Sequence, residues 1–169
     1  MKGIIFSAAM VMSIVNGSKT QTRRPIKPQP IYGITWLGGN YEAWNYKETY
    51  WDKDETMSDL AICKYAPYKP NEILYVRKSR FMPKAAAQLF IIIKTVSVER
   101  LQEIGPYHAL NEGFGPSCNI FNTDRDSVNP RNVFRNYWNK LYAKKPEYNW
   151  EANPFVWAIT FERIDKKEK

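Results

Sequence analysis

A short basic stretch that begins at Gly17 carries the side chains best suited to chemistry in this sequence. It supplies the ammonium group of Lys19, the hydroxyl of Thr22 and the guanidinium groups of Arg23 and Arg24. Such groups can hold an anion, recognise a nucleobase, or activate a hydroxyl as a nucleophile. Gly17 follows an apolar helical run and can adopt the left-handed conformation that ends a helix. The simpler interpretation is a solvated basic turn that joins this helix to a strand.

The composition of the chain favours a polyanionic partner. Its 169 residues predict one domain with its own hydrophobic core. The formal net charge of +8 makes nucleic acid or phosphorylated nucleotides plausible ligands. The two cysteines, Cys63 and Cys118, and the single histidine, His108, lack the spacing of a zinc site. We therefore expect neither a metal nor a cofactor, and two free thiols in a reducing cytoplasm, with a disulfide as the alternative.

The N-terminal segment could be mistaken for a signal peptide, because an apolar run follows Met1 and Lys2. Ser7 and Ser13 interrupt this run, and no small-residue cleavage site follows it. We instead predict a short strand at 2–6 and a buried helix at about 8–16, with Ser7 as its N-cap. No apolar run elsewhere is long enough to span a membrane, so a cytoplasmic protein is expected.

Alternation and capping residues predict the remaining elements. Strands are expected at 72–77, 87–98 and 154–164. A short helix is expected from Pro106 to Gly113, and a longer one begins at Asn129-Pro130. The longer helix should dock on the sheet through an apolar stripe made of Val133, Phe134, Tyr137, Trp138, Leu141 and Tyr142. Short strands interleaved with a few helices indicate the α+β class, with a mixed or barrel-like sheet.

One aromatic-rich insertion interrupts this pattern. It covers about 31–68, contains three tryptophans, and has Gly38-Gly39 as the expected turn of a weak hairpin. Its rings could stack nucleobases, pack a loop-rich layer over the core, or bind a host protein. We predict a single domain over 1–165 that includes this insertion, followed by a basic tail at 166–169.

Four separate segments of the chain resemble the ASCH domain family. They comprise Gly17, Lys19, Thr22 and Arg24; the run 69–77; the run 108–114; and Trp150 with the run 153–157. The longer layout resembles the branch that phages and prophages commonly encode. This resemblance implies a PUA-like fold, a mixed β-barrel with peripheral helices and a cleft on one side.

The resemblance also implies a set of catalytic residues. In ASCH amidohydrolases that act on N(4)-acetylcytidine, the matching positions are Lys19, Thr22 and Glu112. Thr22 would attack the acyl carbon, and Lys19 would act as its base if burial or nearby cations lowered the pKa of the amine. Glu112 would orient the lysine or shuttle a proton. Positions 19 and 22 have an odd separation, so their side chains converge only if the chain turns between them.

The sequence departs from the phage-type pattern around one predicted strand. Pro70-Asn71-Glu72 stands where that branch has Pro-Gly-Asp, and Arg77-Lys78-Ser79-Arg80 stands where it has Arg-Glu-Thr-Trp. This exchange removes a carboxylate and adds positive charge near the expected cleft. We therefore predict a monomer that binds RNA or a modified nucleoside through Lys19, Arg23, Arg24 and Arg77. The alternatives are an amidohydrolase acting on an acylated nucleoside and a phage accessory protein that binds a host protein.

Overall fold

A computed structural model describes residues 1–27, 29, 36–37, 40–41, 66–115 and 129–164. Its strands are β1 (Gly3–Ile5), β2 (Gln21–Pro25), β3 (Trp36–Leu37), β4 (Asn40–Tyr41), β5 (Ile73–Arg77), β6 (Phe90–Arg100) and β7 (Phe155–Ile164). Its α-helices are α1 (Ala8–Val15), α3 (Pro106–Asn111) and α4 (Pro130–Leu141). Short 3-10 helices lie at Lys84–Ala86, Leu101–Glu103 and Pro146–Tyr148. The α+β class expected from the sequence is confirmed.

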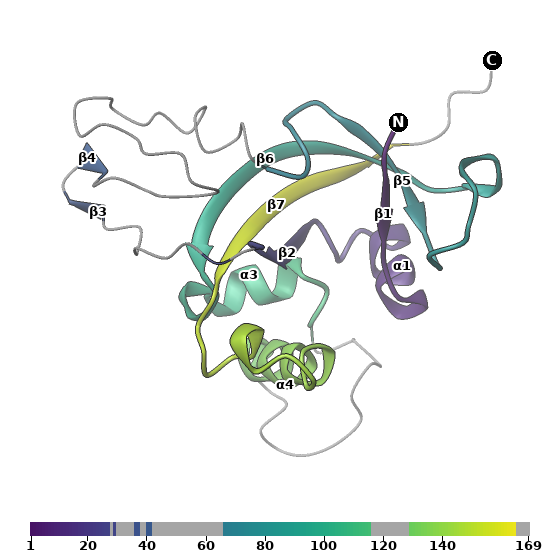
Figure 1. Ribbon diagram of the computed structural model, residues 1–169. Helices are drawn as coiled ribbons and strands as arrows, with labels where there is room; N and C mark the ends of the chain where they lie inside the picture. The colour runs from purple at the N-terminus through teal and green to yellow at the C-terminus, as the bar shows by residue number, and fades with distance from the viewer. Residues whose placement is uncertain (28, 30–35, 38–39, 42–65, 116–128, 165–169) are drawn as a thin grey trace.

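Five strands form one mixed sheet in the order β1-β5-β6-β7-β2. β1 runs parallel to β5, and the other neighbouring pairs are antiparallel. The long strands β6 and β7 curve strongly across the molecule (Figure 1), with an irregularity in their register between Ile93 and Thr95. The expected barrel is not closed, because β1 and β2 are both edge strands of this sheet.

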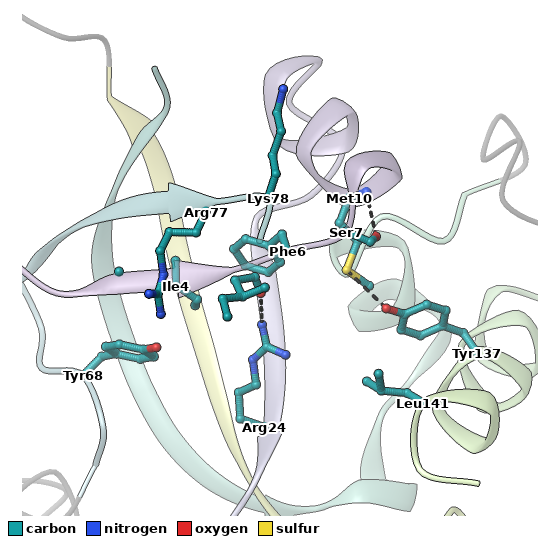
Figure 2. Close-up of a pocket in the computed structure, with 12 residues that line it drawn as sticks. Ile4, Phe6, Ser7, Met10, Arg24, Tyr68, Arg77, Lys78, Tyr137 and Leu141 are labelled. Atoms are coloured by element: carbon teal, nitrogen blue, oxygen red, sulfur yellow. Dashed lines mark hydrogen bonds between the residues drawn. The ribbon is translucent and has the colours of Figure 1, made fainter. Parts of the chain in front are cut away.

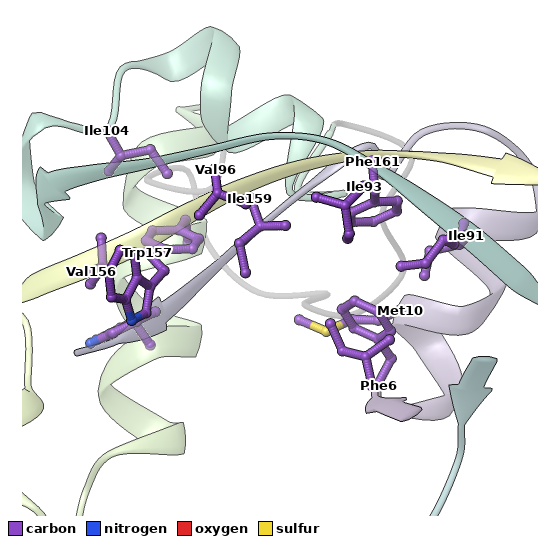
Figure 3. Packing of buried hydrophobic residues seen from close by; sticks show 14 of the residues in the cluster. Phe6, Met10, Ile91, Ile93, Val96, Ile104, Val156, Trp157, Ile159 and Phe161 are labelled. Carbon is purple, nitrogen blue, oxygen red and sulfur yellow. The ribbon is translucent and has the colours of Figure 1, made fainter. Parts of the chain in front are cut away.

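The hydrophobic core fills the concave side of the curved sheet. Alternate residues of β7 are buried as predicted, from Phe155 to Phe161. Figure 3 shows Ile159 and Phe161 on the sheet, with Phe6 and Met10 across from them. The Phe6 and Phe161 rings lie with their centroids 5.9 Å apart. This packing fixes α1 and the end of β1 against the sheet.

The helix caps follow the sequence, but the docking of α4 does not. The Ser7 hydroxyl accepts a hydrogen bond from the Met10 amide, and Asn129 caps α4 as predicted. α4 packs chiefly against α3 rather than on the sheet (Figure 1). Leu141, predicted to lie in the core, is 50% exposed because it follows the last buried turn of the helix.

Part of the aromatic insertion lies within the described residues. β3 and β4 pair antiparallel, with Trp36 opposite Tyr41, in agreement with the expected weak hairpin. Its turn at Gly38-Gly39 and the range 42–65 lie outside the described residues, as do both cysteines and the basic tail. Within the described part of the chain, no helix has the length and apolar character needed to cross a membrane.

Candidate functional site

The basic stretch that follows Gly17 contributes two of its cations to a buried ion-pair network. The Lys19 ammonium donates to the Glu112 carboxylate and to the Glu112 and Gln21 carbonyl oxygens, at 2.8, 2.8 and 2.9 Å. Arg23 donates to the other Glu112 carboxylate oxygen at 3.2 Å and pairs with Glu99. Lys19, Arg23 and Glu112 are each less than 5% exposed. The three donor hydrogens of the ammonium group are therefore all engaged.

Two glycines let the chain bring Lys19 to Glu112. Gly17 has a φ of 81°, which turns the chain out of α1 as predicted. Gly113, which follows Glu112, has a φ of 91°, and a Cβ there would lie 3.3 Å from the Lys19 Cβ. An isolated β-bridge between Lys19 and Glu112 joins the two segments. The turn at Gly17 precedes Lys19, however, and the chain enters β2 at Gln21, so the turn required between positions 19 and 22 is not present.

Thr22 lies apart from this hydrogen-bonded network. It faces Ile159 across the β2–β7 pair, whereas the next residue, Arg23, projects from the opposite face of β2. Thr22 is 3% exposed, and its hydroxyl has no hydrogen bond to Lys19 or to any other described residue. Burial lowers the pKa of Lys19, while the Glu112 carboxylate opposes this change. Of the three predicted catalytic residues, the structure pairs Lys19 with Glu112 only.

A cleft of about 480 Å³ opens beside this network, along the free edge of β1. Figure 2 shows the Arg24 side chain reaching up to β1, with Tyr68 on one side and Tyr137 on the other. Arg77 and Lys78, at the end of β5, supply two more cations to its wall. The Phe6 ring lines the cleft and also contacts the Lys19 ammonium, 5.5 Å from its centroid. The buried network therefore lies directly beside the cleft but is closed to solvent.

Arg24 bridges the two open edges of the sheet. Its side chain starts on β2, and one terminal nitrogen donates to the Ile5 carbonyl of β1 at 2.7 Å. The Arg24 guanidinium carbon also lies 5.4 Å from the centroid of the Phe6 ring. These two contacts hold the partly exposed Arg24 guanidinium group between β2 and β1, the two edge strands that hydrogen bonds would join in a closed barrel.

Arg77 is positioned by the absence of a side chain at Gly3. A Cβ at Gly3 would lie 2.7 Å from the Arg77 Nε and 2.7 Å from the Tyr75 ring. The Arg77 guanidinium carbon lies 5.8 Å from the centroid of the Tyr75 ring. Its Nε is buried and has no hydrogen-bond partner among the residues that the structure describes. Gly3 thus provides the space in which this guanidinium group lies across β1 and lines the cleft.

A second cleft, of about 420 Å³, shares Arg24 and Tyr68 with the first. Lys27, Tyr142 and Trp157 are among its other lining residues. Burial raises the phenol pKa of Tyr68 and Tyr142, and the charge of Arg24 opposes the rise at both residues. Arg24 therefore acts electrostatically on the walls of both clefts.

The two clefts are basic and aromatic, and none of their described lining residues is acidic. Two of the predicted binding residues, Arg24 and Arg77, line them, whereas Lys19 and Arg23 are buried in the ion-pair network.

Sequence reasoning missed the lining residues Tyr68, Tyr137, Tyr142, Trp157 and Lys27. Tyr137 and Tyr142 were assigned to the core stripe of α4, and only their partial exposure distinguishes them from core residues. Within the described residues, no group of histidine, cysteine or carboxylate side chains could hold a metal ion.

Comparison with solved structures identifies the fold. Protein EF3133 from Enterococcus faecalis V583, of the family DUF984, is 11% identical and has a TM-score of 0.50, with 100% of this chain and 85% of that chain covered. The chain shares this fold. The ASCH domain from Lactobacillus crispatus JV V101 is 13% identical, with a TM-score of 0.47 over 98% of this chain and 80% of that chain.

These likenesses concern the fold alone. The second of these structures is named as an ASCH domain, the family that the sequence motifs resemble. The phage-type branch stays a prediction. No family model matches the chain, and no curated protein matches its sequence.

Proposed function

We propose that this protein binds RNA or a nucleoside in the cleft that runs along β1. The proposal rests on the lining of this cleft, which combines three cations with two tyrosine rings: Arg24, Arg77 and Lys78 with Tyr68 and Tyr137. None of the described residues that line it carries a carboxylate. Cations attract phosphates, and aromatic rings stack on bases of any sequence. The net charge of +8 adds long-range attraction for a polyanion.

The geometry of Arg24 supports a role in binding rather than in folding alone. A guanidinium group presents five donors, and Arg24 uses one terminal nitrogen on the Ile5 carbonyl. Among the described residues, its other nitrogens have no hydrogen-bond partner. An arginine oriented by a backbone carbonyl loses little freedom when an anion binds, which favours affinity.

A salt titration of RNA binding tests the proposal. Filter binding of a short single strand should show affinity that falls steeply as salt rises, with a log–log slope of about 0.7 for each phosphate contacted. Arg24→Gln should weaken binding and reduce this slope by about 0.7. Arg135→Gln is the matched control, because it removes the same charge from an exposed ion pair on α4. Absence of binding at low salt would overturn the proposal.

A second variant tests Arg77 without changing the net charge. Gly3→Ala places a methyl group 2.7 Å from the Arg77 Nε, so the guanidinium group must move. Gly3 has no positive φ, so its backbone accommodates alanine. We expect weaker RNA binding with an unchanged melting temperature. Unchanged binding would remove Arg77 from the site.

The two alternative functions find less support in the described residues. Hydrolysis of an acylated nucleoside would require Lys19 to give up a proton and a hydrogen bond, and Thr22 to become accessible. Binding of a host protein was suggested by the aromatic insertion, most of which lies outside the described residues. No specific contact in the described part of the chain favours either alternative over nucleic-acid binding.

A further inference from the structure

The two clefts meet at a shared wall, and this arrangement defines the size of ligand that they fit. Arg24 and Tyr68 line both clefts. Each cleft, at about 480 and 420 Å³, falls within the range of single small-molecule sites. Each also carries its own aromatic and cationic groups beyond the shared pair. Two sites of this size that share one cation suit a ligand made of two linked units.

The cation at the junction has donors that remain available among the described residues. Arg24 is fixed to the Ile5 carbonyl at 2.7 Å, and its remaining nitrogens have no partner among the described residues. Burial raises the phenol pKa of Tyr68, Tyr137 and Tyr142, and Arg24 is the largest opposing influence on each. The guanidinium group therefore lies within electrostatic reach of tyrosines in both clefts.

We propose that a single-stranded oligonucleotide lies across both clefts, with one nucleotide in each and the linking phosphate on Arg24. This inference rests on the proposed function and narrows it, since a free nucleoside would occupy only one cleft. A phosphodiester offers oxygen acceptors to the unpartnered nitrogens of Arg24. The flanking bases meet Tyr68 and Tyr137 in the first cleft and Tyr142 in the second. A base must be unpaired and unstacked to reach such rings, which excludes a duplex.

The first cleft also has a place for a second phosphate. Arg77 and Lys78 lie at the end of β5, on the part of the first cleft that the second cleft does not share. Gly3 leaves the Arg77 guanidinium in place across the β1 edge. A strand that enters the first cleft therefore meets Arg77 and Lys78 before its linking phosphate reaches Arg24. Lys27 lies in the second cleft, where the strand leaves.

A series of ligands of increasing length tests this arrangement. Competition against a labelled hexauridine strand would measure the affinities of uridine, uridine monophosphate, the dinucleotide UpU and a duplex RNA. The same series with the other three bases covers base preference. We expect the dinucleotide to bind at least about tenfold more tightly than the mononucleotide, because it adds a stacked base and a bridging phosphate. The duplex should bind more weakly than the single strand.

Variants assign the two nucleotides to their clefts. Lys27→Gln should weaken binding of the dinucleotide and leave that of the mononucleotide unchanged, because a single nucleotide takes the more cationic first cleft. Arg24→Gln should remove most of the gain from mononucleotide to dinucleotide. Arg135→Gln, which lowers the net charge equally from an exposed pair on α4, should preserve that gain.

The outcomes separate this inference from the proposed function. If hexauridine binds but the dinucleotide gains nothing over the mononucleotide, the two-nucleotide arrangement is overturned and RNA binding stands. If the duplex binds as tightly as the single strand, the single-strand assignment fails. If neither the strands nor uridine bind at low salt, the proposed function itself falls.

Discussion

The buried ion-pair network predicts a large loss of stability when its carboxylate is neutralised. Glu112 lies 2.8 Å from the Lys19 ammonium and 3.2 Å from the Arg23 guanidinium, with both cations buried. At an effective dielectric constant of about 20, these two contacts correspond to roughly 6 and 5 kcal/mol of gross attraction. Glu112→Gln also removes the carboxylate's desolvation penalty of several kcal/mol. The expected net loss is therefore about 3–5 kcal/mol of unfolding free energy.

Urea denaturation of Glu112→Gln and of a surface control measures this loss. Glu151→Gln removes a carboxylate from the exposed pair with Arg135 and should cost less than about 1 kcal/mol. For a chain of this length, the Glu112 variant should also melt roughly 6–20 °C lower. The double variant Lys19→Met/Glu112→Gln should be more stable than the sum of the two single changes predicts. A loss for Glu112→Gln no larger than that of the control would refute the view that Glu112 compensates the buried charges of Lys19 and Arg23.

Two further predictions concern chemistry and pH. Because Lys19 and Thr22 are closed to solvent, we expect no release of cytidine from N(4)-acetylcytidine by chromatographic assay. Release that Thr22→Val abolishes would instead establish the amidohydrolase, and this variant should fold because the hydroxyl makes no hydrogen bond with another described residue. Burial raises the phenol pKa of Tyr68, Tyr137 and Tyr142 above its ordinary value, so the folded state holds these protons longer than the unfolded state and stability falls as pH rises above about 10. Ultraviolet titration of Tyr→Phe variants should show each missing phenol titrating above pH 10, and ionisation at the ordinary value would contradict this.

The sequence by itself determined the local elements of the fold. Ser7 and Asn129-Pro130 mark the starts of α1 and α4, because a cap depends only on residues a few positions away. The alternation along β7 identified its buried face for the same reason. The pairing of Lys19 with Glu112 was implied by the family resemblance and is present, although no local pattern connects residues so far apart.

Only the tertiary structure decided which cations line the cleft. Arg23 and Arg24 are adjacent in sequence, and successive residues of a strand point to opposite faces. The register of β2 against β7 places Arg23 with Glu99 and Glu112, and directs Arg24 to the open edge of β1. A sequence contains the alternation but not the register, because register depends on how a distant strand packs. The cleft also depends on distant parts of the chain, because it lies where the two edge strands β1 and β2 approach each other and the curved sheet does not close.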